Sequence, residues 1–298
     1  MASLSSFLPI IILGAISLNS KVCNGEVHKR LFVSGDSLFH AGNNKYLNGS
    51  MRVVQAYYPY GITYHNQSTG RVSDGLINLP QQLANFKKVA SSLDKDVLLR
   101  SVFLISIGGN DYFSFNTKNP KATQAERKRY QRMEIYELGG RKFGFQNVGP
   151  LGCMPLIKQQ SFPQLKGICN TNFKYMQHYT IKPFQKALKK LETRLTGFKY
   201  SIFDYYRALL DRINNASKYG FKEGIIACCG TGQFYGQNCG GGFNGTTSYN
   251  LCTNPSQYVF FDGGHTTEKV NSQLANLIWS GKRNVTRPYN VKQLFELP

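Results

Sequence analysis

The stretch VFLISIGGND, residues 102–111, joins a continuous apolar run to a turn of small and polar residues. Three other short runs of apolar and aromatic residues have the same character, at residues 31–34, 142–148 and 199–206. Strands that are covered on both faces read in this continuous way. Helical patterns separate the runs, and the clearest lies at residues 175–195, where apolar side chains recur at three- and four-residue spacing. This alternation predicts an α/β fold built on a parallel sheet.

The N-terminus is typical of a secretory signal peptide. An apolar run at residues 7–18 is followed by small and polar residues. Crossing a membrane takes about 20 apolar residues, so this run is too short, and no later run is long enough. We expect a signal peptide over residues 1–25, a single domain over residues 26–298, no transmembrane segment and a secreted, extracellular protein.

Cysteine usage agrees with export. Removing the signal peptide leaves an even number of cysteines, which suits an oxidising compartment: Cys153, Cys169, Cys228, Cys229, Cys239 and Cys252. We expect Cys153 to pair with Cys169. We expect the vicinal Cys228 and Cys229 to pair with Cys239 and Cys252, in an order that the sequence leaves open. A zinc site is the alternative, but the chain has no CxxC pair, so we expect no metal.

Five Asn-x-Ser/Thr sequons also occur along the chain. A single sequon arises easily by chance, whereas several on an exported chain predict glycosylation. The candidate asparagines are Asn48, Asn66, Asn215, Asn244 and Asn284.

The charge balance is strongly basic, with 36 Lys and Arg against 16 Asp and Glu and a net charge of +20. Such an excess predicts an anionic partner, here a cell-wall polyanion or a lipid surface, although it also serves general solubility. The densest cluster is Arg127, Lys128, Arg129 and Arg132. No zinc-finger spacing, basic zipper or RNA-binding aromatic motif accompanies it, so we expect no nucleic-acid partner.

A candidate nucleophile follows the first apolar run. Ser37 lies in Gly35-Asp36-Ser37-Leu38, and ligands in open α/β sheets bind at the carboxyl ends of strands. The glycine allows a tight turn that would expose the hydroxyl. The alternative is that Asp36 or Ser37 only caps a helix, and this local sequence alone favours that interpretation.

Two further stretches could complete a site for acyl transfer. Asn110 follows the run at 102–107, where its amide could donate to a developing oxyanion, although Gly-Asn-Asp is also an ordinary turn signal. After a short strand-like run at 258–261, Asp262 lies three residues before His265 and could fix its tautomer. A helix-capping Asp beside a surface His is the alternative. A hydroxyl, an amide donor and an Asp-His pair together suit a serine hydrolase.

The chain resembles the plant GDSL esterases and lipases of the SGNH hydrolase superfamily, and among them most resembles the defence-associated GDSL lipases. The motifs that carry the resemblance follow one another from residue 35 to residue 271: GDSLFHAGNN (35–44), ISIGGNDY (105–112), GGRKFGFQNVGPLGC (139–153) and YVFFDGGHTTEKVN (258–271). The resemblance implies a three-layer α/β/α, flavodoxin-like fold and hydrolysis of acyl esters or lipids without metal or cofactor. It also implies an apoplastic or cell-wall location.

The resemblance also assigns roles. It implies that Ser37 is the nucleophile, His265 the general base and Asp262 the residue that orients it. Asn110 and the Ser37 N–H would form the oxyanion hole. Two substitutions depart from the family pattern outside these roles: His40 replaces an Asp, and Thr266 replaces a Pro.

A larger departure is an absent segment. The family's second motif block supplies a glycine N–H to the oxyanion hole and an edge strand to the sheet. Here residues 70–75 lead almost directly into residues 79–83, and no such block is found. We therefore expect a sheet that lacks one edge strand, with backbone groups of the first strand left unpaired. This predicts a hydrolase with reduced turnover, or a sequence from which one segment has been lost.

Two functions from different classes remain. One is a secreted serine esterase or lipase that works through an acyl-enzyme. The other is an impaired or inactive secreted glycoprotein of the same fold that binds an anionic wall or lipid surface. The presence of Ser37, Asn110, Asp262 and His265 favours the first, and the absent block favours the second.

Overall fold

The computed structural model describes residues 29–39, 58–63, 79–109, 136, 138–242 and 245–298. Each of the four apolar runs forms a strand, as predicted. The strands are β1 (Leu31–Gly35), β2 (Val102–Ser106), β3 (Lys142–Gln146) and β4 (Lys199–Phe203). They pair in parallel in that order, and β7 (Thr286–Pro288) adds an antiparallel strand beyond β4.

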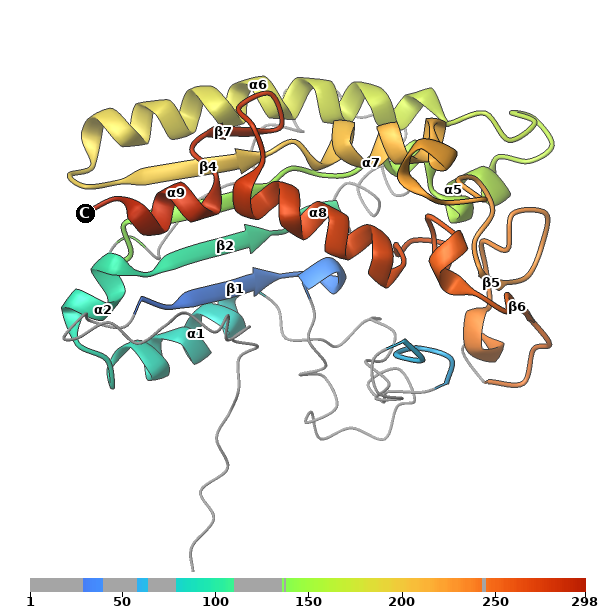
Figure 1. Cartoon of the computed structure of the whole chain (residues 1–298), viewed down its shortest axis with the longest axis horizontal. Helices are drawn as coiled ribbons and strands as arrows, with labels where there is room; N and C mark the ends of the chain where they lie inside the picture. The colour runs from blue at the N-terminus through green and yellow to red at the C-terminus, as the bar shows by residue number, and fades with distance from the viewer. Residues whose placement is uncertain (1–28, 40–57, 64–78, 110–135, 137, 243–244) are drawn as a thin grey trace, which may run out of the picture.

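Helices fill both faces of this sheet (Figure 1). The α-helices are α1 (Leu79–Ala90), α2 (Lys95–Arg100), α5 (Pro155–Gln160), α6 (Thr171–Arg194), α7 (Tyr205–Asn214), α8 (Glu268–Ser280) and α9 (Val291–Glu296). Short 3-10 helices span Ser37–Phe39, Leu151–Cys153, Ala216–Tyr219, Cys239–Gly241 and Pro255–Gln257. None of these helices is both long enough and apolar enough to cross a membrane.

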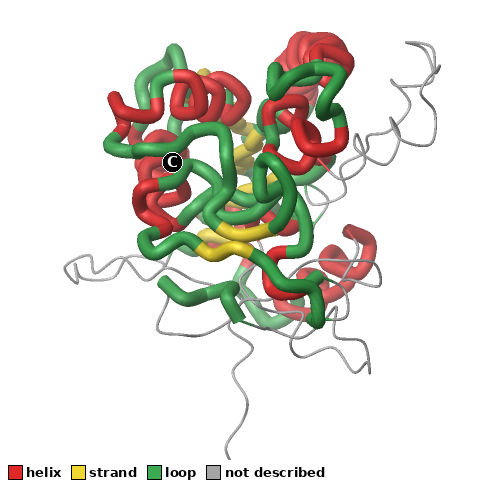
Figure 2. Tube along the Cα trace, turned by 90° about the vertical axis from the view of Figure 1, so that its right-hand side faces the viewer, coloured by secondary structure: helices red, strands yellow, loops and turns green. Residues whose placement is uncertain are grey.

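Alternation along the strands divides the core between the two faces. Phe103 and Phe143 pack with apolar residues of α1, α2 and α6 in one cluster. Val102, the residue before Phe103 on β2, points to the opposite face and packs with Val291 and Leu294 of α9. Figure 2 looks along the strands and shows helices on either side of them. The fold is therefore the predicted three-layer α/β/α arrangement.

β1 lies at the edge of the sheet. Among the strands that the structure describes, β1 pairs with β2 alone, in agreement with the predicted loss of an edge strand. The carboxyl ends of β1 to β4 point to one side of the molecule (Figure 1). A loop-rich region with the small strands β5 (Cys229–Gly230) and β6 (Asn250–Leu251) lies on that same side.

The prediction of a strand at residues 258–261 is wrong. Val259 and Phe260 are fully buried, but with the residues that the structure describes the segment makes only single bridges, between Glu223 and Tyr258 and between Phe260 and Thr266. Its apolar character therefore reflects burial in a cross-linked loop rather than membership of the sheet.

Candidate active site

The Ser37 turn follows directly from β1. The Asp36 N–H donates to the Ser106 carbonyl of β2 at 3.0 Å, which extends the parallel pairing by one residue. A Cβ on Gly35 would lie 2.1 Å from that same carbonyl, so glycine is required there. Ser37 then begins the 3-10 helix, and Asp36 Oδ1 accepts from the Leu38 N–H at 3.3 Å. Asp36 thus caps the turn, while Ser37 sits at its start.

The Asp262–His265 pair is built within one loop. Asp262 Oδ1 accepts from the Gly264 and His265 N–H groups, each at 2.8 Å, which folds the loop back on its own carboxylate. His265 Nδ1 lies 2.9 Å from Oδ1 and 3.0 Å from Oδ2. An ionised carboxylate can only accept, so Nδ1 carries the proton and Nε2 is left as the basic nitrogen. The sequence prediction that these two residues interact is confirmed.

The environment keeps Asp262 ionised. Its burial alone would raise the pKa, but the charge of His265 and hydrogen bonds from His265, Gly264 and Tyr60 hold the pKa of Asp262 well below its usual range. A buried anion beside the imidazole stabilises the imidazolium form. The pair therefore has the electrostatics of a general base with its orienting acid.

Tyr205 connects the serine turn to the histidine loop. This residue begins α7, is buried and belongs to the same core cluster as Phe260. Leu38, next to Ser37, packs against this cluster. Burial, opposed by Thr266 and reinforced by Asp36, raises the pKa of Tyr205 well above its usual range. Leu38 adjoins Ser37 and Phe260 lies two residues before Asp262, so this cluster supports both halves of the site. No hydrogen bond joins Ser37 to His265 among the described residues, as is common before substrate binds.

Sequence reasoning did not single out Tyr205. It lies within the apolar run at 199–206, whereas β4 ends at Phe203 and Tyr205 begins α7. The carboxyl end of that run was the usable signal, because the carboxyl ends of parallel strands form the binding edge. Thr266, noted only as a departure from the family pattern, donates its hydroxyl to Asn271 Oδ1 at 2.5 Å.

Asn110 lies outside the described residues, so its place in an oxyanion hole stays a prediction. The residue before it is described. A Cβ on Gly109 would lie 3.7 Å from Asp36 Oδ2, which puts the end of this segment beside the serine turn.

Gln82 of α1 occupies the outer side of β1. Its Oε1 accepts from the Gly35 N–H at 3.0 Å, and its Nε2 donates to the Gly35 carbonyl at 2.8 Å. One carboxamide thus replaces both hydrogen bonds that a neighbouring strand would make at this residue. At Gly35, the expectation of unpaired edge groups is wrong, because a side chain satisfies them.

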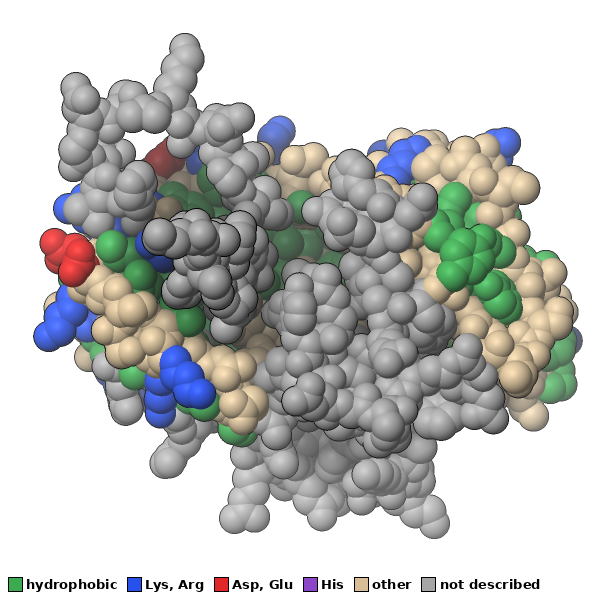
Figure 3. Space-filling model, turned by 90° about the horizontal axis from the view of Figure 1, so that it is seen from below, with side chains coloured by type: hydrophobic (Ala, Val, Ile, Leu, Met, Phe, Trp, Pro, Cys, Tyr) green, Lys and Arg blue, Asp and Glu red, His purple; other side chains and the backbone are tan. Residues whose placement is uncertain are grey.

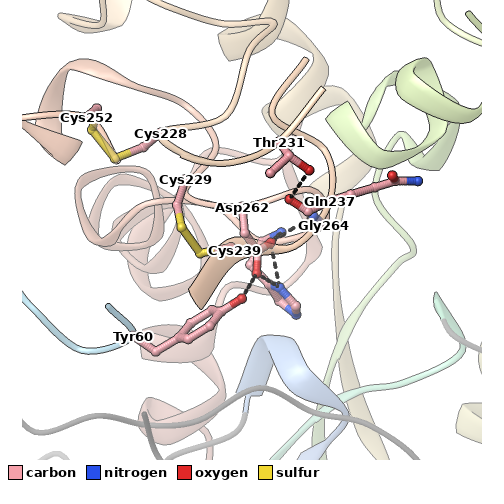
Figure 4. The surroundings of a disulfide bond; sticks show 10 residues. Tyr60, Cys228, Cys229, Thr231, Gln237, Cys239, Cys252, Asp262 and Gly264 are labelled. Atoms are coloured by element: carbon pink, nitrogen blue, oxygen red, sulfur yellow. Dashed lines mark hydrogen bonds and ion pairs between the residues drawn. A yellow bond between two sulfur atoms is a disulfide. The ribbon is translucent and has the colours of Figure 1, made fainter. Parts of the chain in front are cut away.

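Three disulfides staple the carboxyl-end loops. They join Cys153 to Cys169, Cys228 to Cys252 and Cys229 to Cys239. The pairing agrees with the sequence prediction and settles the order that it left open. The Cys229 N–H donates to the Phe261 carbonyl at 2.7 Å, so the cross-linked segment supports the chain just before Asp262 (Figure 4).

Two of the five sequon asparagines lie within the residues that the structure describes. Asn215 and Asn284 are exposed. Asn48, Asn66 and Asn244 lie outside the described residues, as does the basic cluster at 127–132.

The sequence model described as GDSL-like Lipase/Acylhydrolase matches residues 31–278. The chain belongs to this family. It is 38% identical to GDSL esterase/lipase 3 of Arabidopsis thaliana, with 98% of this chain and 97% of the relative covered. GDSL esterase/lipase 2 of the same plant is 36% identical, with 98% and 96% covered. The protein named Inactive GDSL esterase/lipase-like protein 25, also from Arabidopsis, is 30% identical, with 90% and 75% covered.

Family membership places the chain among the carboxylic ester hydrolases. The match to GDSL esterase/lipase 3 extends over 358 aligned positions, more than the 298 residues of this chain. That relative therefore carries residues opposite gaps in this GDSL chain, in agreement with the absence of an internal segment.

Proposed function

We propose that this GDSL family member is a secreted serine esterase or lipase in which Ser37, His265 and Asp262 form the catalytic triad. The observation that carries the proposal is the Asp262–His265 contact at 2.9 Å. Phe260, just before this loop, packs in the same cluster as Tyr205 and Leu38 of the Ser37 turn. The substrates are acyl esters or lipids, and the intermediate is an acyl-enzyme.

The reaction proceeds in two half-reactions. His265 Nε2 takes the Ser37 proton as Oγ attacks the ester carbonyl, and the Ser37 N–H and Asn110 stabilise the oxyanion. Collapse of the tetrahedral intermediate breaks the ester C–O bond, and His265 returns the proton to the departing alcohol. Water then attacks the acyl-enzyme with the same base, which releases the acid and restores Ser37. Asp262 stays ionised and orients the imidazole throughout.

Turnover is expected to be low for this class. The absent block would have supplied a third oxyanion donor, and losing one such donor costs roughly 10²–10³ in turnover. The acyl-enzyme route itself uses groups that this chain retains, so the defect lowers the rate without changing the chemistry.

The test compares the purified protein with Ser37→Ala on a short-chain chromogenic ester. Loss of the nucleophile is expected to reduce the rate by at least about 10³-fold. Ser280→Ala, on the exposed end of α8, serves as the matched control and should keep the parental rate. Equal hydrolysis by the parent and by Ser37→Ala would contradict the proposal.

Secretion and glycosylation belong to the same proposal. The three disulfides and the exposed Asn215 and Asn284 support it. Protein recovered from the apoplast should lose mass on treatment with an N-glycosidase. A protein that stays inside the cell with no glycan would contradict this part.

The second candidate is a non-catalytic glycoprotein that binds an anionic wall or lipid surface. The net charge of +20 and the relative that is named inactive favour it. On the face drawn in Figure 3, however, the described Lys and Arg side chains stand in separate groups rather than in one patch. Binding to a polyanion that persists in high salt would contradict a charge-driven partner.

A further inference from the structure

A buried hydroxyl outside the Asp-His loop lies against Asp262. Tyr60 Oη donates to Asp262 Oδ2 at 2.8 Å, whereas the two backbone N–H groups of the loop donate to Oδ1. The imidazole is nearly equidistant from the two carboxylate oxygens, at 2.9 and 3.0 Å. Tyr60 is therefore the contact that fixes the second oxygen from the side away from the loop's own backbone.

Packing fixes the direction of the Tyr60 hydroxyl. Tyr60 is 9% exposed and belongs to a cluster with the Cys229–Cys239 disulfide and Phe261. The rings of Tyr60 and Phe261 meet edge to face, with centroids 5.6 Å apart. In Figure 4 the phenol points at Asp262, and the Cys229–Cys239 disulfide lies beside Asp262. The donor is thus held in position by contacts that do not depend on the hydrogen bond.

We propose that Tyr60 is a positioning residue of the hydrolytic site, which holds the Asp262 carboxylate in the orientation that His265 requires. This inference rests on the triad proposed above. Rotation about the Cβ–Cγ bond moves both carboxylate oxygens, so the backbone N–H groups on Oδ1 and the Tyr60 hydroxyl on Oδ2 restrain it together. Weakening this restraint loosens the alignment of the imidazole with Ser37. Tyr60 adds the restraint at Oδ2 that the loop's backbone N–H groups do not supply.

The hydroxyl also shares the charge of the carboxylate. A donor on Oδ2 withdraws electron density from the carboxylate, so the carboxylate stabilises the His265 imidazolium less strongly. Among the described residues, the groups that shift the pKa of Asp262 are His265, the Gly264 N–H and Tyr60. A change confined to Tyr60 therefore reports on the Asp262–His265 contact.

Tyr60→Phe removes the hydroxyl and keeps the ring. Because a hydrogen bond to a charged group is lost, kcat should fall by about ten- to a hundredfold with KM unchanged. The acid limb of the kcat/KM profile should move to higher pH, because the carboxylate then binds the imidazolium more strongly. Tyr58→Phe is the matched control: Tyr58 is 65% exposed and should give parental kcat and pH dependence.

A parental kcat with an unmoved acid limb in Tyr60→Phe would overturn the proposal and leave Tyr60 as a packing residue. Should Tyr60→Phe fold poorly, 3-fluorotyrosine at position 60 gives the converse test. It is a stronger donor, so the acid limb should move to lower pH, and an unmoved limb would overturn the proposal.

Titration of the His265 ring by NMR separates this proposal from the triad itself, because it needs no turnover. A higher His265 pKa in Tyr60→Phe than in the parent supports the positioning role even if ester hydrolysis is absent. Identical titrations in the two proteins count against Tyr60 alone.

Discussion

The two halves of the candidate site are supported in opposite ways. The Asp262–His265 loop is held by backbone bonds to its own carboxylate, by Tyr60 and by a disulfide-stapled neighbour. The Ser37 turn extends from an edge strand, with Ser106 on one side and the Gln82 side chain on the other. The acid–base half thus depends on the loop's own hydrogen bonds and on Tyr60. The nucleophile half depends on the edge of the sheet, where the structure describes no strand beyond β1.

This difference explains how the site survives the absent block. A loop that satisfies its own polar groups needs no neighbouring strand. A serine at the end of an edge strand needs a substitute for that strand, and Gln82 supplies one at Gly35. The account predicts that the two halves fail differently when their supports are removed.

The largest effect is expected in the acid–base half. Asp262→Asn leaves the loop geometry nearly intact but favours the wrong imidazole tautomer, so kcat should fall by about 10⁴-fold with KM little changed. Steady-state kinetics on a soluble ester measures this. A loss of less than tenfold would show that the pair does not act as base and orienting acid.

The nucleophile half should respond to Gln82 in both stability and rate. Gln82→Leu removes both bonds to Gly35, which should lower the free energy of unfolding by about 1–3 kcal/mol and reduce kcat by about tenfold. Gln82→Glu keeps the acceptor for the Gly35 N–H and loses the donor. Its free energy of unfolding and its kcat should therefore lie between those of the parent and of Gln82→Leu.

Asn85→Leu is the control for the same helix, because Asn85 is exposed on α1. The free energy of unfolding of Asn85→Leu, measured in urea, should stay within about 0.5 kcal/mol of the parent value. If Gln82→Leu behaves like Asn85→Leu, the edge of β1 needs no substitute for the absent strand.

The smallest effect is expected in the pH dependence of stability. The pKa of Asp262 is lowered in the folded protein, so its contribution is present above the unfolded Asp pKa of about 3.9 and is lost as the pH falls through the folded value. The thermal midpoint of the parent should therefore fall more steeply than that of Asp262→Asn between pH 5 and pH 2. Parallel curves would show that Asp262 gains no net stabilisation as an anion.

Sequence reasoning predicted the parts of the molecule that depend on near neighbours. Continuous apolar runs predicted β1 to β4, and the three-residue spacing of Asp262 and His265 predicted their contact. The cysteine pairs were also predicted, except for which of Cys228 and Cys229 bonds to Cys239 and which to Cys252. The two cysteines are adjacent, so the sequence around them does not distinguish their partners.

The supporting contacts could not be predicted in this way, because they join distant segments. Tyr60 meets Asp262 across 202 residues, and Gln82 meets Gly35 across 47. No periodicity or motif in either segment indicates a partner at such a separation. The run at 258–261 was mistaken for a strand because burial in a stapled loop and burial in a sheet select the same apolar residues.

The central claim is that Ser37 is a nucleophile activated by His265. The most direct measurement is peptide mapping by mass spectrometry after reaction with a fluorophosphonate, which traps activated serines. One adduct is expected, on Ser37, and it should form far more slowly in Asp262→Asn. No adduct in the folded protein, or an adduct on another serine, would contradict it.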